Sequence, residues 1–308
     1  MALLDESAKG VYVIAVTPFA DDGALDLEST DRMVDFYLGK GATGLTVLGM
    51  MGEAPKLTAA ESNTFVKRVL ARVGGRVPVV VGVSAPGFAP MRELSESVMA
   101  EGAAGVMVAP PGNLRTDDQI YNYYEAVAET LGNTPFVLQD FPLVTNVQIA
   151  PATILRIVKA LPTCVMLKHE DWPGLTKISA LRAASEKGER RISILVGNGG
   201  MFLPEELGRG ADGAMTGFAY PEMMVDVWKA YTAGDVERAH DLFDAYLPLA
   251  RYEQQPGLGL TIRKYTLAKR GAIASGALRK PGPKLSHSDI ADIERLIARQ
   301  TRRLAEIG

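Results

Sequence analysis

Eight short apolar runs, rich in β-branched residues, recur along the chain and are separated by longer segments of helical period. They occupy residues 11–17, 44–49, 78–84, 105–110, 136–140, 164–168, 192–198 and 213–217. Their apolar residues are nearly continuous, which is typical of strands covered on both faces of a parallel sheet. Because the runs are spaced by roughly one βα unit, they predict a closed (β/α)8 barrel.

The segments between the runs contain signals for the start and end of helices. In TAAESNTFVKRVLARV, Thr58 and Glu61 have the spacing of a capping box, and apolar residues follow on one face. In PMRELSESVMAEGA, Pro90 lies near the start and Gly102 at the end of the expected helix. We expect these helices to form the outer ring of the barrel.

The segment that follows the eighth run is longer than a barrel requires. Residues 235–253, 260–273 and 286–304 are all helical in period. We therefore expect a catalytic barrel over residues 1–232. A C-terminal helical region over residues 233–308 would pack on the barrel or on a partner subunit.

The composition suits one large core and excludes several classes of protein. Of the 308 residues, 47% are hydrophobic and 22% are charged, which disfavours disordered and fibrous chains. Lys and Arg number 33 and Asp and Glu number 36, without a long run of either sign. Nucleic acid and anionic membranes are therefore not expected as partners, whereas small molecules are.

Residues that form disulfides or metal sites are few. The single cysteine, Cys164, lies in an apolar run and is expected in the core. His169, His240 and His287 lack the spacing of a metal site, so we expect metal-free chemistry. The first residues do not resemble a signal peptide, and no segment has the roughly 20 apolar residues of a membrane-spanning helix. A cytoplasmic location is expected.

Lys168 ends the sixth run, in CVMLKHEDWPG. A charged ammonium is costly to bury, so this lysine must face solvent, be paired, or serve chemistry as a neutral amine. Because active sites of such barrels lie at the ends of the strands, its position favours catalysis. The alternative is a structural lysine paired with Glu170 or Asp140.

Two strand ends at the predicted mouth of the barrel hold amide and carboxylate groups. Gln139 can orient a substrate oxygen, although an amide does not titrate. Asp140 is either a substrate-binding residue or a turn cap. Glu170 lies two residues after Lys168, so both side chains face the same way in an extended chain. This makes Glu170 a candidate acid or base, or only an ion-pair partner.

A glycine-rich turn follows the second run, in LGMMGEAPKLT. Around Met50, Met51 and Gly52, backbone N–H groups can approach a ligand oxyanion. A tight turn between strand and helix is the alternative.

The seventh and eighth runs end in VGNGG and GAMTG. Gly197, Asn198, Met215 and Thr216 are candidate contacts to a polyhydroxy chain, or parts of ordinary barrel turns. His169 is expected to be a packing residue.

With these motifs the chain resembles the Schiff-base aldolases and dehydratases, a family that includes dihydrodipicolinate synthase and N-acetylneuraminate lyase. The resemblance covers nearly the whole chain, from AVTPF through LGMMGE, APPGN, LQDFP, LKHED and GNGG to the C-terminal helices. It implies that Lys168 forms a Schiff base and that residues 50–52 bind the carboxylate of a 2-keto acid. It also implies a barrel with a C-terminal helical region, usually a homotetramer, that uses no metal or organic cofactor.

The chain departs from members that make dihydrodipicolinate. Met50 and Met51 replace two hydroxylated residues, Gln139 replaces a tyrosine and Val144 replaces an arginine, while PPGN stands in place of a loop tyrosine. Without that proton relay and that arginine, dihydrodipicolinate synthesis is not favoured. The LQDFP strand end, GAMTG and the tail look more similar to the branch that contains L-2-keto-3-deoxyarabonate dehydratase, although the MMGE turn differs.

The expected reaction is dehydration of a 2-keto-3-deoxy sugar acid through an imine on Lys168. Glu170, or a water held by Gln139, would move protons. Cleavage of the C3–C4 bond would instead make the protein an aldolase that releases pyruvate, and a dihydrodipicolinate synthase-like activity ranks next. Outside the enzymes, the alternative is a keto-acid-binding protein without catalysis.

Overall fold

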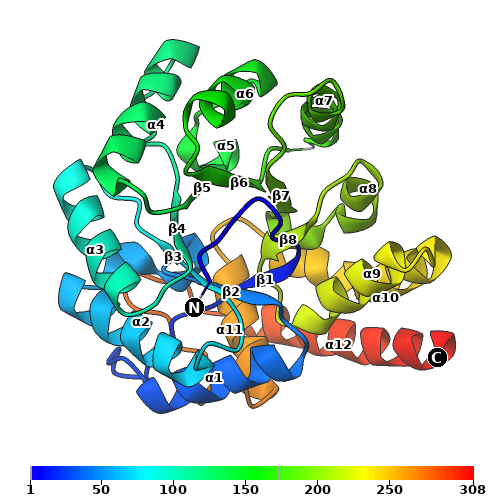
Figure 1. Ribbon diagram of the computed structural model, residues 1–308. Helices are drawn as coiled ribbons and strands as arrows, with labels where there is room; N and C mark the ends of the chain where they lie inside the picture. Colours follow the sequence, from blue (N-terminus) through cyan, green and yellow to red (C-terminus); the bar gives the residue numbers. More distant parts are fainter. Residues whose placement is uncertain (1, 173) are drawn as a thin grey trace.

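The computed structural model describes residues 2–172 and 174–308 of the chain. Eight parallel strands form a closed barrel in sequence order, and helices surround it (Figure 1). The strands are β1 (Gly10–Ile14), β2 (Gly44–Val47), β3 (Val79–Gly82), β4 (Gly105–Val108), β5 (Phe136–Asp140), β6 (Cys164–His169), β7 (Ser193–Val196) and β8 (Gly213–Thr216). The expected (β/α)8 barrel is confirmed, and each strand coincides with one of the eight apolar runs.

The outer helices follow the strands as the sequence patterns predict. They are α1 (Leu27–Gly39), α2 (Ala59–Val73), α3 (Phe88–Ala100), α4 (Asp117–Leu131), α5 (Pro142–Thr145), α6 (Pro151–Ala160), α7 (Leu175–Glu186), α8 (Leu203–Gly208) and α9 (Pro221–Thr232). The capping box of α2 is present, because the Thr58 side chain accepts from the Glu61 amide and the Glu61 carboxylate accepts from the Thr58 amide. Helix α3 begins at Phe88, two residues before Pro90.

Apolar side chains pack on both sides of the barrel wall. Ile14, Met107 and Met215 belong to the cluster inside the barrel. Cys164 belongs to the outer cluster between strands and helices, where burial raises the pKa of its thiol to about 12. Its expected place in the core is confirmed.

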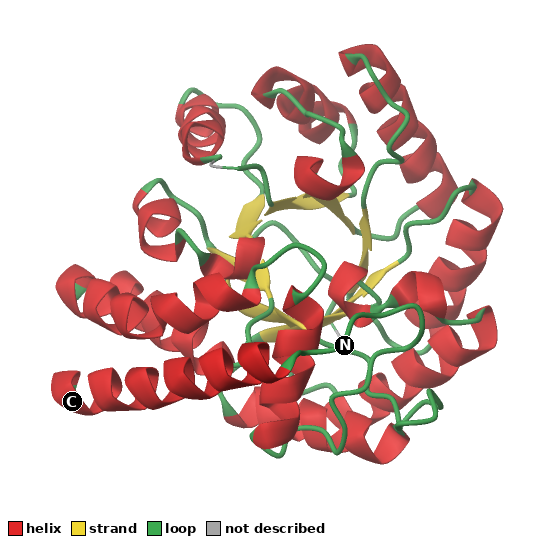
Figure 2. Ribbon diagram, turned by 180° about the vertical axis from the view of Figure 1, so that it is seen from behind, coloured by secondary structure: helices red, strands yellow, loops and turns green. Residues whose placement is uncertain are grey.

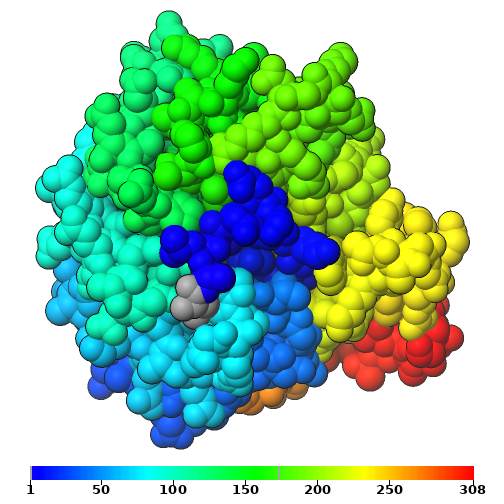
Figure 3. Space-filling view, viewed as in Figure 1, coloured from blue at the N-terminus to red at the C-terminus, as the bar shows by residue number. Residues whose placement is uncertain are grey.

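The N-terminal segment covers one end of the barrel. Leu4 joins the inner cluster, and its amide donates to the Ala104 carbonyl, just before β4, at 2.8 Å. Figure 3 shows the N-terminal segment, in blue, across the middle of this face of the molecule. An active site must therefore open at the other end, where the strands terminate.

Three helices follow the barrel, namely α10 (Val236–Glu253), α11 (Gly259–Lys269) and α12 (His287–Ile307). Helix α10 packs against α9 and α12 (Figure 1), and Figure 2 shows α12 from behind, running to the C-terminus. We propose residue 232 as the boundary between barrel and C-terminal region, because α9 completes the eighth βα unit there. Over residues 2–172 and 174–308, no helix is both long and apolar enough to cross a membrane.

Candidate active site

A cavity of about 150 Å³ opens at the carboxyl ends of the strands. Residues that end β1, β5, β6 and β8 line it, together with residues of the following turns. It is smaller than the about 300–1,000 Å³ of sites for drug-sized ligands, so it suits a small metabolite. A larger hollow of about 600 Å³ lies outside the barrel between α7 and α8 and has no strand-end residue in its lining.

Lys168, Glu170 and Gln139 meet in this cavity. Lys168 Nζ lies 2.9 Å from Glu170 Oε2, and Gln139 Nε2 donates to the same oxygen at 2.7 Å. All three side chains are buried, and the sheet register places Gln139 beside Lys168. The prediction that Lys168 and Glu170 face the same way is confirmed. The lysine is thus both paired with a carboxylate and open to the cavity.

Neighbouring turns fix the position of Glu170. Its amide donates to the Asp140 carbonyl at 2.8 Å, and Asn198 Nδ2 donates to the Glu170 carbonyl at 3.2 Å. A Cβ at Gly197 would lie 2.1 Å from Glu170 Cγ. Only glycine therefore leaves room for this carboxylate at the end of β7.

Met50 and Met51 lie in a 3-10 turn, η1 (Met50–Gly52), and both line the cavity. Within the described part of the chain, their amides donate to no other group, as expected at the start of a helical turn. Gly52 is buried and does not line the cavity. Its carbonyl accepts from Thr17 Oγ1 at 2.6 Å, which anchors the turn.

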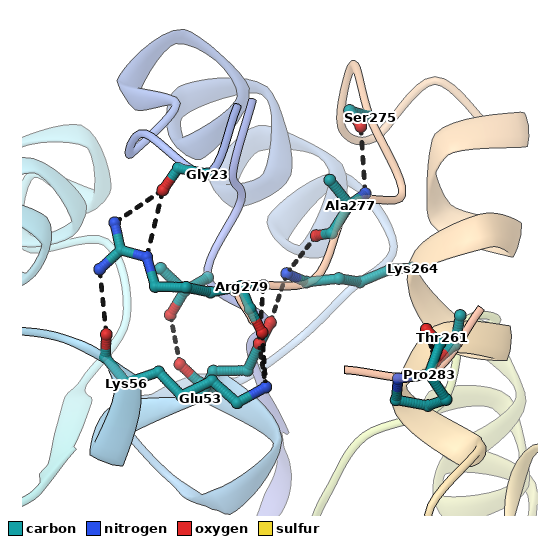
Figure 4. A network of polar contacts seen from close by, with 11 residues as sticks. Gly23, Glu53, Lys56, Thr261, Lys264, Ser275, Ala277, Arg279 and Pro283 are labelled. Carbon is teal, nitrogen blue, oxygen red and sulfur yellow. Dashed lines mark hydrogen bonds and ion pairs between the residues drawn. The ribbon is translucent and has the colours of Figure 1, made fainter. Parts of the chain in front are cut away.

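Glu53 ties this turn to the C-terminal region (Figure 4). Its buried carboxylate accepts from Lys264 Nζ at 2.6 Å, from Lys56 Nζ at 2.9 Å and from the Arg279 amide at 3.1 Å. Lys264 Nζ also donates to the Ala277 carbonyl at 2.9 Å. Burial lowers the pKa of Lys264, whereas the Glu53 carboxylate opposes this effect. The network holds residues 50–53 in one place.

Four predicted substrate contacts do not line the cavity, namely Gly52, Gly197, Asp140 and Met215. Asp140 points to the outer side of β5, where its Oδ2 accepts from Lys177 Nζ at 2.7 Å. Successive strand residues face opposite sides, so Gln139 and Asp140 cannot both point inward. Met215 is fully buried in the cluster inside the barrel. Neither side chain lines the cavity, so their predicted substrate contacts do not fit the structure.

The packing prediction for His169 fits its place behind Asp140. The ring Nδ1 is 3.6 Å from Asp140 Oδ2, and Nε2 is 3.0 Å from the Gly174 carbonyl oxygen. Asn198 and Thr216 do line the cavity, and Thr216 Oγ1 accepts from the Gly199 amide at 2.8 Å. Gly197 lies behind Glu170 and does not itself line the cavity.

Comparison with known proteins gives this barrel a family. The model of the dihydrodipicolinate synthetase family matches residues 7–300. The chain belongs to this family. It is a lyase, as its named relatives are.

Two named relatives of this chain differ in the activity that their names give. It is 30% identical over 292 residues to L-2-keto-3-deoxyarabonate dehydratase of Azospirillum brasilense, covering 91% of this chain and 90% of the relative. It is 29% identical over 304 residues to 4-hydroxy-tetrahydrodipicolinate synthase of Thiobacillus denitrificans, covering 98% of each. A crystal structure described as dihydrodipicolinate synthase from Rhodopseudomonas palustris is 52% identical, with a TM-score of 0.95 over 97% of this chain and 100% of that one.

Sequence reasoning missed two cavity residues of this family member that come from its C-terminal region. Gln254 follows α10 and Arg263 lies on α11, and both line the cavity. One signal was present, because Arg263 and Lys264 stand together inside an otherwise uncharged helical stretch, GLTIRKYTLA. In residues 2–172 and 174–308, no three His, Cys, Asp or Glu side chains form a group that could hold a metal ion.

Proposed function

We propose that this lyase dehydrates a 2-keto-3-deoxy sugar acid through a Schiff base on Lys168. The observation that supports this most directly is the buried Lys168 amine, 2.9 Å from the Glu170 carboxylate, in a small cavity at the carboxyl ends of the strands. The similarity to a relative named L-2-keto-3-deoxyarabonate dehydratase supports dehydration as the outcome.

The first step joins Lys168 Nζ to C2 of the keto acid. Glu170 accepts a proton from the ammonium, and the neutral amine attacks the carbonyl carbon. Glu170 then returns the proton to the former carbonyl oxygen, which leaves as water as the protonated imine forms, and Glu170 is again a carboxylate. The protonated imine then acts as an electron sink for C3. The amides of Met50 and Met51 donate to the substrate carboxylate and fix the orientation of C2 relative to Nζ.

The second step removes hydrogen from C3 and hydroxyl from C4. Glu170 takes the C3 proton, and the electron pair forms an enamine with the imine carbon. The C4–O bond then breaks, and the hydroxyl leaves as water with the proton that Glu170 returns. A proton shift from C5 to C3 and tautomerisation of the resulting enol convert the C5 alcohol into the aldehyde, and water hydrolyses the imine to free Lys168. Gln139 holds Glu170 through its 2.7 Å hydrogen bond, and it cannot carry the proton itself because an amide does not titrate.

Dihydrodipicolinate synthesis is the second candidate, because most named relatives and the 52% identical structure have that activity in their names. Four side chains disfavour dihydrodipicolinate synthesis. Gln139 stands in place of the tyrosine of the proton relay, Val144 in place of the arginine, and Met50 and Met51 in place of hydroxylated residues. Product analysis separates the candidates, since dehydration of a sugar acid gives a semialdehyde without pyruvate, whereas dihydrodipicolinate synthesis consumes pyruvate in a condensation. An aldolase would instead release pyruvate.

Borohydride trapping tests the proposed nucleophile. In the parent protein, pyruvate plus borohydride should leave a covalent adduct, and mass analysis should locate it on the peptide that contains Lys168. Lys168→Ala should abolish the adduct. Lys177→Ala is the matched control, because Lys177 is also buried and paired but does not line the cavity. An adduct that persists in Lys168→Ala rejects the assignment.

A further inference from the structure

Arg263 brings the C-terminal region into the cavity that contains Lys168. The guanidinium is 2% exposed and lines this cavity, although α11 is no part of the barrel. Its Nε donates to Glu253 Oε1 at 2.6 Å, and its Nη2 donates to the Gly217 carbonyl at 2.5 Å. These two contacts hold the guanidinium plane in one orientation.

The third nitrogen of Arg263 has no acceptor. Among the described residues, Nη1 is a buried donor without a hydrogen-bond partner. A buried donor that makes no hydrogen bond is unfavourable, so such groups in native proteins point to a bound molecule or another specific role. Here the group belongs to a side chain that lines a cavity, so a ligand can supply the acceptor.

The end of β8 leaves room for this nitrogen. A Cβ at Gly217 would lie 2.3 Å from Arg263 Nη1 and 2.9 Å from the Ile14 carbonyl oxygen. Any larger residue at 217 would displace the guanidinium from the cavity. Lys168 lies on β6, two strands from the end of β8, so its amine and the Arg263 guanidinium line different parts of the same cavity. A substrate bound to Lys168 at C2 would therefore meet Nη1 with another part of its chain.

The charges around the cavity determine which substrate group can accept a hydrogen bond from Arg263 Nη1. Both cations in its lining are paired, Lys168 with Glu170 at 2.9 Å and Arg263 with Glu253 at 2.6 Å. The cavity thus has no uncompensated positive charge for a second carboxylate. A neutral hydroxyl can accept from Nη1 without adding a buried charge.

We propose that Arg263 is a substrate-binding residue whose Nη1 donates to a distal hydroxyl of a monocarboxylate sugar acid. This inference rests on the proposed function for its substrate class. Under this proposal, the C-terminal region of the protein selects a substrate with a hydroxylated carbon chain over one with an unsubstituted chain and over a dicarboxylate.

Binding of unreactive ligands tests Arg263 without relying on imine formation. The ligands are 2,4,5-trihydroxypentanoate, 2-hydroxypentanoate and 2-hydroxyglutarate, which share five carbons and a C1 carboxylate but have no keto group to form an imine. Calorimetry on the parent protein should show tightest binding of the trihydroxy acid, by roughly 10–100-fold over 2-hydroxypentanoate, the range expected for one donor of a charged group. Arg263→Lys keeps the charge beside Glu253 and should lose this preference.

Arg270→Lys is the matched control. Arg270 also pairs with a carboxylate, Glu222, and donates to a carbonyl, that of Ala219, but it does not line the cavity. It should keep the preference. The inference is overturned if the parent shows no preference, if Arg263→Lys retains it, if Arg270→Lys loses it equally, or if 2-hydroxyglutarate binds most tightly. Failure of the parent to form the borohydride adduct with pyruvate would instead reject the proposed function.

Discussion

In the proposed mechanism, Glu170 connects the nucleophile with proton transfer. Its Oε2 is within hydrogen-bond distance of both Lys168 Nζ and Gln139 Nε2. Glutamine at this position would still accept from both donors, but it could not take a proton from C3. One isosteric change can therefore separate the two proposed roles of Glu170, which are holding the lysine and moving the proton.

Glu170→Gln should form the pyruvate adduct more slowly, because the Lys168 ammonium has lost its proton acceptor, and should lose most dehydration. We expect kcat to fall by roughly 10²–10⁴-fold, the usual contribution of a general acid or base, because the C3 proton has lost its acceptor. Borohydride trapping measures the imine, and release of the semialdehyde measures elimination.

Asp171→Asn is the control for this change. Asp171 pairs with Lys177 at 2.8 Å and does not line the cavity, so this variant should keep both activities. Unchanged dehydration in Glu170→Gln would reject Glu170 as the proton acceptor and favour the alternative, a water held by Gln139. Equal loss of adduct and product would mean that Glu170 acts only as the ion-pair partner of Lys168.

Among the elements, the short helix α8 contains a buried acid that the proposed mechanism does not use. Glu206 is 5% exposed, and its Oε2 has no hydrogen-bond partner among the described residues. Burial, with a smaller effect of the Glu205 charge, raises the pKa of Glu206 from 4.5 to about 8. The folded protein therefore keeps a proton that the unfolded chain releases above about pH 4.5.

This difference makes α8 a source of pH-dependent stability. The contribution is fully present below about pH 4.5 and is lost as the pH rises through about 8, because the folded state binds more protons over that range. Since each pKa unit is worth about 1.4 kcal/mol, the loss amounts to a few kcal/mol. Thermal unfolding should show Tm falling from pH 5 to pH 8.5 in the parent and falling less in Glu206→Gln. Glu205→Gln should have the smaller effect, and parallel curves for all three proteins would contradict the assignment.

The strands and the first helices could be predicted because their signals are local. A strand covered on both faces needs a continuous apolar run, and the α2 capping box needs only Thr58 and Glu61 three residues apart. Lys168 and Glu170 were also predictable as neighbours, because residues two apart on a strand share a face.

The remaining parts of the site depend on contacts between distant residues. Arg263 contacts Gly217, which lies 46 residues earlier in the sequence, and no periodic pattern predicts a contact over that separation. The direction of Asp140 depends on which of two adjacent strand residues faces inward, and the pairing of Gln139 with Lys168 decides it. Sequence patterns therefore locate the strand ends at the mouth of the barrel, whereas the packing of α11 determines which C-terminal side chains line the cavity there.

At the scale of the whole molecule, α11 is buried against the barrel far more than α12 is. Lys264 is fully buried and pairs with Glu53 of the barrel at 2.6 Å. In α12, only Ile293 and Gln300 are buried. We therefore expect α11 to unfold together with the barrel strands and α12 to open earlier. Hydrogen exchange should show protection of residues 259–269 that matches β6, and weaker protection of residues 287–307.

Lys264→Met tests this coupling, because it leaves the buried Glu53 carboxylate without its closest cation. Breaking a buried pair on one side costs about 3–5 kcal/mol, so protection should fall together in α11 and in the strands, and Tm should drop. Lys269→Met is the control on the same helix, since Lys269 pairs with Glu294 at a half-exposed site where an ion pair is worth at most about 1 kcal/mol. If Lys264→Met lowers protection in α11 alone and leaves the strands unchanged, then residues 233–308 form a separately folding unit, and the substrate-binding role of Arg263 would depend on how that unit docks.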